Sequence, residues 1–242
     1  MQLENSIQRT MLPSDEGAPG LVVRYRGGGW LNVRGGLTRQ RARTLLAGRW
    51  AGLQAPLVPL RDRLLDSEPV AVVHAHGRTM LELIRRQTPD TGRPREVWYC
   101  VPGPGSAATV RRGLAKRGVA EDPLLVDFFD ALNAHHDRPL PQRGNFVTPS
   151  RWRTIESLFG DSLDADNGRA PLWHQDYVIY EAPSGDALLY GRTGRMGWYI
   201  MPEARYERFW NGFKGFLRFY AEFQDRFSGL DSYSTSDFLG RA

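Results

Sequence analysis

The sequence predicts an α+β fold in which a mixed or mainly antiparallel sheet is covered by helices, with a C-terminal amphipathic helix closing the core. Residues 187–190 and 197–201 are short apolar runs rich in strand-forming residues. The segment 191–196 between them contains two glycines, which supply the positive-φ positions that a hairpin turn needs. Beyond the hairpin, aromatic residues recur at three- and four-residue steps, which predicts a helix over residues 203–226.

The first half of the chain is expected to alternate strands and helices. Residues 1–20 contain a run of Pro, Gly and acidic residues, so they are expected to form a flexible arm. Thr38 is a favourable N-cap for a helix that ends near Gly48. The other elements expected here are strands over residues 21–26, 69–73, 80–84 and 96–101, an extended run over 30–33 and a short helix over 59–65.

The segment Pro-Gly-Pro-Gly at residues 102–105 is the strongest break in the chain. It divides a basic α+β half, residues 21–102, from a second α+β half, residues 103–242. Ser106, Ser150 and the pair Asp122-Pro123 each predict the start of a helix. The remaining expectations are helix ends near 117 and 159, loops over 133–144 and 161–168, and a strand over 176–181.

Composition restricts the class of protein. The chain has 242 residues, 41% of them hydrophobic, which is enough for a folded core. Its apolar runs are too short to span a membrane and no signal peptide is visible, so we expect a soluble, cytoplasmic protein without membrane contact. The single cysteine, Cys100, excludes an internal disulfide and is expected to be a buried structural thiol.

Positive charge is concentrated in the first half. Residues 1–118 carry 19 Lys+Arg and 9 Asp+Glu, whereas residues 119–242 carry 13 and 18. Arginine with neighbouring aromatic residues is typical of RNA-binding surfaces. A solvated helix face, or an arginine bias from a GC-rich coding sequence, gives the same pattern. The alternative nucleic-acid surface consists of Arg34, Arg39, Arg41, Arg43, Trp30 and Trp50.

His74 and His76 are two residues apart on a predicted strand, so both imidazoles face the same side and could hold one divalent metal ion. A metal-dependent phosphodiesterase or nickase is therefore a second alternative. It needs a carboxylate ligand, and Asp66 and Glu68 are too close in sequence to be convincing ones. We favour the simpler interpretation that His74 and His76 are two polar residues at the end of a strand. We therefore expect no metal or other cofactor.

Three segments of the second half resemble the SUKH superfamily, which contains bacterial SMI1/KNR4-type immunity proteins and US22-type proteins of large DNA viruses. The segment 124–133 is similar to the family's early helix with its Asn-containing turn. Residues 185–190 and 194–199 resemble its central hairpin, and residues 210–217 resemble its closing helix. The resemblance covers about half of the chain, from residue 110 to residue 227.

This resemblance implies a non-enzymatic protein without shared catalytic residues. Members of the family mostly bind other proteins, as toxin inhibitors in bacteria or against host defence in viruses, where the protein enters the host cytoplasm or nucleus. Some viral members bind double-stranded RNA. We therefore expect stoichiometric neutralisation of a protein partner, with an acidic loop suited to a basic partner such as a nuclease toxin. The expected contact residues are Tyr206, Trp210, Phe219, Asp161, Asp164 and Asp166.

Overall fold

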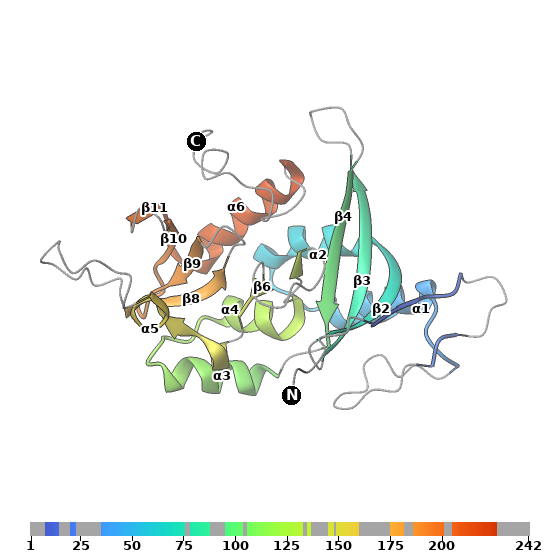
Figure 1. Ribbon diagram of the computed structural model, residues 1–242, viewed down its shortest axis with the longest axis horizontal. Coiled ribbons are helices and arrows are strands. Elements are labelled where there is room, and N and C mark those ends of the chain that lie inside the picture. Colours follow the sequence, from blue (N-terminus) through green and yellow to red (C-terminus); the bar gives the residue numbers. More distant parts are fainter. Residues whose placement is uncertain are drawn as a thin grey trace, which may run out of the picture.

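The computed structural model describes residues 8–14, 20–22, 35–75, 78–87, 95–103, 106–132, 135–136, 145–147, 149–159, 175–181, 186–200 and 205–226. These residues form an α+β fold, as predicted. Two sheets lie at opposite ends of the molecule with helices between them (Figure 1). Every strand pair in the described part of both sheets is antiparallel.

The first sheet has the strand order β1-β2-β3-β4-β5. Its long strands confirm the predicted strands at residues 69–73, 80–84 and 96–101, because each is a β-branched or apolar run bounded by turn residues. The strands are β1 (Gln8–Met11), β2 (Glu68–Ala75), β3 (Arg78–Gln87), β4 (Arg95–Pro102) and β5 (His135–His136).

Both outer strands of this sheet lie in segments that the sequence does not predict to be ordered. The prediction of a flexible arm is wrong for β1, which pairs with β2, and Leu12 beyond it is 2% exposed. Its backbone N–H donates to the Val70 carbonyl at 2.8 Å. The loop prediction is likewise wrong for β5, which pairs with β4. Leu21 forms a bridge with Leu37, whereas residues 23–34, including most of two predicted extended runs, lie outside the described residues.

The second sheet contains the predicted hairpin. It has the order β11-β10-β9-β8-β6, with β7 beside β8, and Tyr190 faces Met196 across the hairpin. The strand expected at residues 176–181 is confirmed as β8. The strands are β6 (Asn145–Phe146), β7 (Arg153–Thr154), β8 (Tyr177–Glu181), β9 (Ala187–Tyr190), β10 (Met196–Ile200) and β11 (Arg205–Trp210).

Predicted N-caps begin three of the helices. The side chains of Thr38, Ser106 and Asp122 accept hydrogen bonds from backbone N–H groups two or three residues further on. The α-helices are α1 (Arg39–Trp50), α2 (Val58–Leu65), α3 (Ala107–Lys116), α4 (Pro123–Asp127), α5 (Ile155–Phe159) and α6 (Gly212–Arg226). The 3-10 turns η2 (Ala55–Leu57) and η4 (Pro149–Arg151) and the π-helical turn η3 (Phe128–Leu132) complete the helical elements.

Two helix predictions are wrong at their N-terminal ends. The stretch predicted as one helix over residues 203–226 divides into strand β11 and helix α6, because Gly212 adopts a φ of 74° that turns the chain between them. The helix predicted from Ser150 divides into η4, β7 and the short helix α5. Its N-terminal cap is Thr154, whose Oγ1 accepts from the Ser157 N–H at 3.1 Å.

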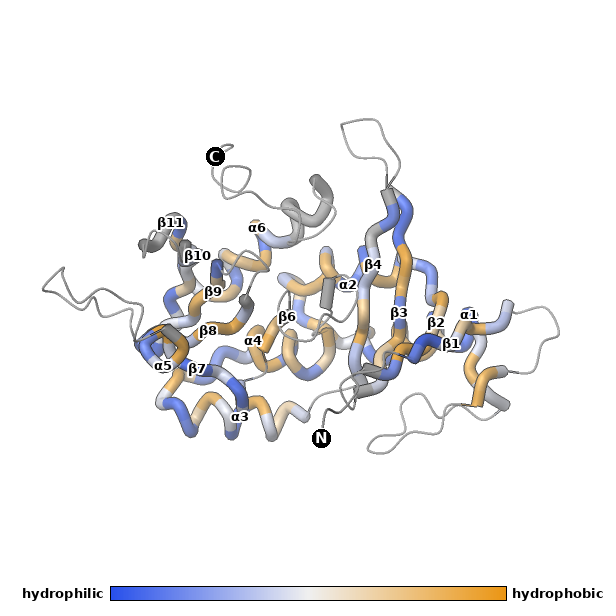
Figure 2. The backbone as a smooth tube through the Cα atoms, in the orientation of Figure 1, coloured by the Kyte–Doolittle hydropathy of each residue, from blue (hydrophilic) through white to orange (hydrophobic). Residues whose placement is uncertain are grey.

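One hydrophobic cluster extends from the inner face of the first sheet to the inner face of the second (Figure 2). Phe146 lies within it and contacts rings from η3, β8 and α6, with centroid distances of 4.9 to 5.7 Å to Phe128, Tyr180 and Tyr220. The division at residues 102–103 matches the change from one sheet to the other, apart from β5, which returns to the first sheet. The interpretation of these halves as separate domains stays a prediction.

Hydrogen bonds from the C-terminal end of α1 connect it to the end of β4 and to the π-helical turn η3. Arg49 donates to the carbonyls of Pro102 and Asp130, both at 3.0 Å, and the Trp50 indole N–H donates to Ala131 at 2.8 Å. Burial lowers the pKa of the Arg49 guanidinium to about 10, and the nearby Asp130 carboxylate opposes part of that shift. No described helix has the length and apolar character needed to cross a membrane.

Candidate functional site

The β9–β10 turn is held in a fixed shape by three interactions. The Gly191 N–H donates to the Arg195 carbonyl at 2.7 Å, and the Gly194 N–H donates back to Gly191 at 2.9 Å. The Arg195 guanidinium donates to Asp176 on the segment before β8 at 2.9 Å. The turn is therefore a rigid corner of the second sheet.

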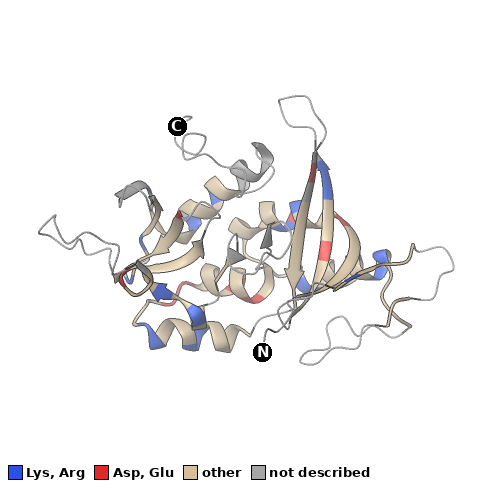
Figure 3. Cartoon of the chain, viewed as in Figure 1, with Lys and Arg blue, Asp and Glu red and all other residues tan. Residues whose placement is uncertain are grey.

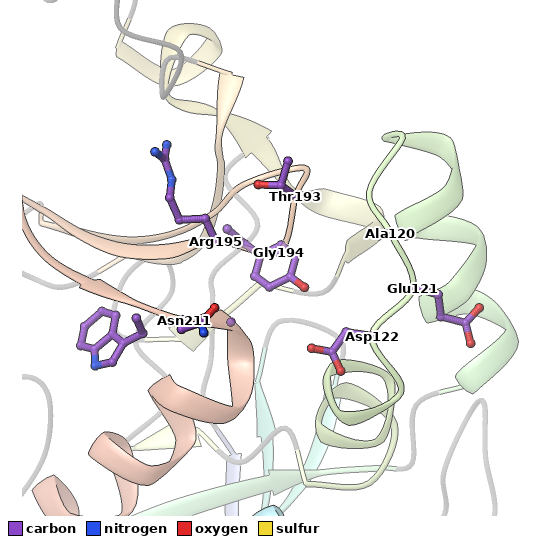
Figure 4. A pocket seen from close by; sticks show the side chains of 10 residues that line it. Ala120, Glu121, Asp122, Thr193, Gly194, Arg195 and Asn211 are labelled. Atoms are coloured by element: carbon purple, nitrogen blue, oxygen red, sulfur yellow. The ribbon is translucent and has the colours of Figure 1, made fainter.

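A cavity of about 460 Å³ opens beside this corner (Figure 4). Three segments that are far apart in the sequence meet there: the β9–β10 turn, the linker between α3 and α4, and the junction between β11 and α6. The turn and the junction are close, because a Cβ added to Gly212 would lie 3.9 Å from the Gly194 carbonyl oxygen. The lining residues are Ala120, Glu121, Asp122, Tyr190, Thr193, Gly194, Arg195, Trp210, Asn211 and Gly212.

Tyr190 is the most deeply buried polar side chain of the cavity lining, with 1% of its surface exposed. Burial raises the pKa of its phenol to about 12, and the Asp122 carboxylate adds to the shift. At neutral pH the hydroxyl is therefore protonated and able to donate a hydrogen bond.

The charged groups at the rim of the cavity are mostly paired with residues outside it. Glu121 accepts from Arg111 at 2.9 Å, and in Figure 4 its carboxylate points away from that of Asp122. The Arg195 side chain also extends away from Asn211 and Asp122 in this view. Its guanidinium donates to Asp176. The interior of the cavity therefore presents hydrogen-bonding groups with one carboxylate, that of Asp122.

An exposed aromatic side chain stands beside the same corner. Phe209 on β11 is 54% exposed, and the Arg195 guanidinium carbon lies 5.4 Å from its ring centre. On the opposite face of β11, Arg208 stacks over Trp210 at 5.6 Å and over Phe219 of α6 at 4.5 Å. We call Phe209 and Arg195 the Phe209 surface. Aromatic and arginine side chains of this kind are enriched in protein–protein interfaces.

The structure changes the predicted partner-contact set. The expectation that Trp210 is exposed is wrong: it is 8% exposed and contacts Phe216 and Phe219 of α6, with ring centres 5.4 and 5.2 Å away. Because side chains alternate along a strand, Phe209 faces outward where Trp210 faces α6. Phe219 is half-buried, and Tyr206 lies on β11 opposite Tyr199. Asp161, Asp164 and Asp166 lie outside the described residues.

Only some of the six residues predicted for the alternative nucleic-acid surface are exposed among the described residues. Trp50 is fully buried and its indole N–H is bonded to Ala131, so the prediction that it stacks on bases is wrong. Arg39 is paired with Glu68, and Arg41 donates to the Gly36 carbonyl at 2.8 Å. Arg43 is exposed on α1. Trp30 and Arg34 lie outside the described residues.

The described cations are also spread over several elements. Figure 3 shows Lys and Arg on α1, on α3 and at one end of β3. Arg117 at the end of α3 is used internally, where it donates to the carbonyls of Ser150 and Trp152. RNA binding by the first half therefore stays a prediction, with Arg43 as its best placed described residue.

The histidine pair is described only in part. His74 lies on β2, and its Nδ1 is 2.8 Å from the Thr79 hydroxyl on β3. His76 lies outside the described residues. Within the described ranges, no three His, Cys, Asp or Glu residues are grouped so that they could hold a metal ion. Metal-dependent chemistry at this pair stays a prediction. Cys100 is buried, as predicted.

The cavity and the Phe209 surface were not predicted from the sequence. Asp122 was identified only as a helix cap, Tyr190 only as a strand residue, and Phe209 as part of a helical stripe. The available signal was the Asn211-Gly212 pair, which is typical of a chain reversal and separates an exposed strand residue from the helix. Comparison with known proteins gave no matching family, no similar curated protein and no similar solved structure.

Proposed function

We propose that this chain is a non-enzymatic protein-binding protein of the SUKH/US22 type, which neutralises a toxin or a host-defence factor by stoichiometric binding. The SUKH relationship is part of the proposal and rests on the resemblance of the hairpin and closing-helix segments. The contact is assigned to the Phe209 surface in place of Trp210, since Trp210 belongs to the core.

The observation that carries the proposal is the exposure of Phe209 beside Arg195. Phe209 has 54% of its surface exposed, so burial of its ring by a partner would make the free energy of binding more favourable. Arg195 is held by Asp176, so it loses little side-chain entropy on binding. An ordered aromatic–arginine surface is the usual centre of a protein interface.

The position of β11 supports the same use. It is the outermost strand in the described order of the second sheet, and addition of a partner strand at a sheet edge is a common mode of protein binding. Arg195 beside Phe209 favours a partner segment with acidic side chains. The acidic residues Asp161, Asp164 and Asp166 remain a predicted second contact for a basic patch of the partner.

The experiment compares the wild-type chain with the variant Phe209→Ser in affinity purification from cells that naturally make the chain, with nuclease added throughout. We expect one protein to co-purify with the wild type in a fixed ratio and to be lost with the variant. Thr44→Ala, an exposed change on α1, is the matched control and should retain the partner. Equal recovery with both variants contradicts the assigned surface.

A further inference from the structure

The cavity beside the β9–β10 turn is lined by Tyr190, whose hydroxyl has no hydrogen-bond partner among the described residues. The residue as a whole is 1% exposed, and its ring lies 5.7 Å from that of Trp152. Its hydroxyl end lies at the cavity wall, since a Cβ added to Gly194 would be 3.6 Å from the Tyr190 oxygen. The hydroxyl can therefore donate a hydrogen bond to a ligand in the cavity.

The N-terminus of α6 enters the same cavity through Asn211 and Gly212. The first turn of this 15-residue helix contains no acidic residue. Among the described residues, the Asn211 side chain makes no hydrogen bond, so it does not cap the helix. The first backbone N–H groups of α6 and the positive end of its dipole therefore favour a negatively charged group.

Asp122 favours a positively charged ligand group, in contrast to the N-terminus of α6. Its Oδ1 accepts from the Leu124 N–H at 2.9 Å, and its Oδ2 accepts no hydrogen bond from a described residue. In Figure 4 its carboxylate is directed to the side of the cavity where Asn211 lies. A carboxylate with a free oxygen favours a positively charged donor such as an ammonium group.

We propose that this cavity binds a zwitterionic α-amino acid, with the ligand carboxylate at Tyr190 and the N-terminus of α6 and the ligand ammonium at Asp122. A simple anion would face the charge of Asp122 without compensation. A simple cation would face the positive end of α6 and leave the Tyr190 donor unsatisfied. A zwitterion satisfies both sides at once.

The size of the cavity agrees with this ligand class. A volume of about 460 Å³ falls within the range of about 300–1,000 Å³ that is usual for small-molecule sites. Trp210 forms an apolar part of the lining, against which the side chain of the amino acid can rest. This inference does not depend on the protein partner proposed above.

The test is isothermal titration calorimetry of the full chain against the twenty free amino acids. For each one that binds, its N-acetyl derivative, which lacks the ammonium, and its α-amide, which lacks the carboxylate, are titrated as well. We expect at least one amino acid to bind with a stoichiometry of one, and each derivative to bind at least about tenfold more weakly. Absence of saturable binding by all twenty, or equal binding of the derivatives, overturns the proposal.

Three variants assign the groups. Tyr190→Phe removes only the free hydroxyl, and Asp122→Asn removes the charge while keeping a good N-cap for α4. Each is expected to weaken the binding of the amino acid about tenfold or more. Glu156→Gln is the matched control, because it neutralises an exposed carboxylate on α5 that does not line the cavity. If Tyr190→Phe and Asp122→Asn bind like Glu156→Gln, with unchanged melting temperatures, the site is not this cavity.

Discussion

Tyr177 and Tyr190 are directly opposite each other on β8 and β9, and both rings lie against Trp152, with centroid distances of 6.0 and 5.7 Å. The Tyr177 hydroxyl donates to the Arg117 carbonyl at 3.0 Å. The Tyr190 hydroxyl has no hydrogen-bond partner among the described residues and lies at the cavity. Two matched side chains thus have different roles, one in the fold and the other in the candidate site.

This difference predicts that the same substitution has different effects on stability at the two positions. Tyr177→Phe leaves the Arg117 carbonyl without this donor and should lower the free energy of unfolding by about 1 kcal/mol. Tyr190→Phe removes a hydroxyl that faces the cavity and has no partner among the described residues, so it should leave the stability nearly unchanged. Urea denaturation of both variants measures this. A loss for Tyr190→Phe as large as that for Tyr177→Phe would show that the Tyr190 hydroxyl is bonded within the fold.

The raised pKa of Tyr190 predicts a dependence of stability on alkaline pH. Between the ordinary phenol pKa of 10 and the folded value of about 12, the folded chain holds a proton that the unfolded chain has lost. The free energy of unfolding should therefore fall as pH rises through this window, by at most about 3 kcal/mol from this group. Tyr190→Phe should show a shallower fall. Denaturation curves with identical slopes for both proteins would contradict the assignment.

Adjacent residues on β11 should respond very differently to truncation. Trp210→Ala removes a side chain packed on α6 and should lower the free energy of unfolding by about 3–5 kcal/mol. Phe209→Ala removes an exposed ring and should change it by about 0.5 kcal/mol or less. Thermal or urea unfolding compares the two. Similar losses would mean that Phe209 is part of the core and unavailable to a partner.

The first half allows a clean test of nucleic-acid binding through Arg43. Arg43→Gln leaves the internal contacts of Arg39 and Arg41 intact, so the fold should be unaffected. If α1 contacts phosphates, the variant should reduce the salt dependence of RNA affinity by about one ion. Fluorescence anisotropy at several salt concentrations measures this slope. Our proposal predicts no difference between the variant and the wild type.

Local patterns in the sequence predict most single elements of this fold. Thr38, Ser106 and Asp122 begin helices because their side chains satisfy free N–H groups, a property that depends only on neighbouring residues. The hairpin is predictable for the same reason, since its apolar strands flank a turn with glycine. The β11–α6 division was missed because aromatic spacing continues across it, and the positive φ of Gly212 depends on the packing around it.

The candidate site depends on contacts between distant segments, and these cannot be obtained from local patterns. Asp122 and Tyr190 are 68 positions apart in the numbering, and only packing of the α3–α4 linker beside the β9–β10 turn brings them to one cavity. The strand assignment of β1 was missed for a similar reason. Its four residues are exposed and three of them are polar, so no apolar pattern marks the strand, which pairs with the edge of β2.

The most direct test of the central claim is site-specific photo-crosslinking from position 209. A benzoylphenylalanine is placed at Phe209, and in a matched chain at the exposed Ala47 of α1, in cells that naturally make the protein. Our account predicts one crosslinked product from position 209 that contains a single copy of a partner protein, is resistant to nuclease and is absent from position 47. No product from position 209, or the same product from both positions, would contradict the assignment of the Phe209 surface as the contact with a protein partner.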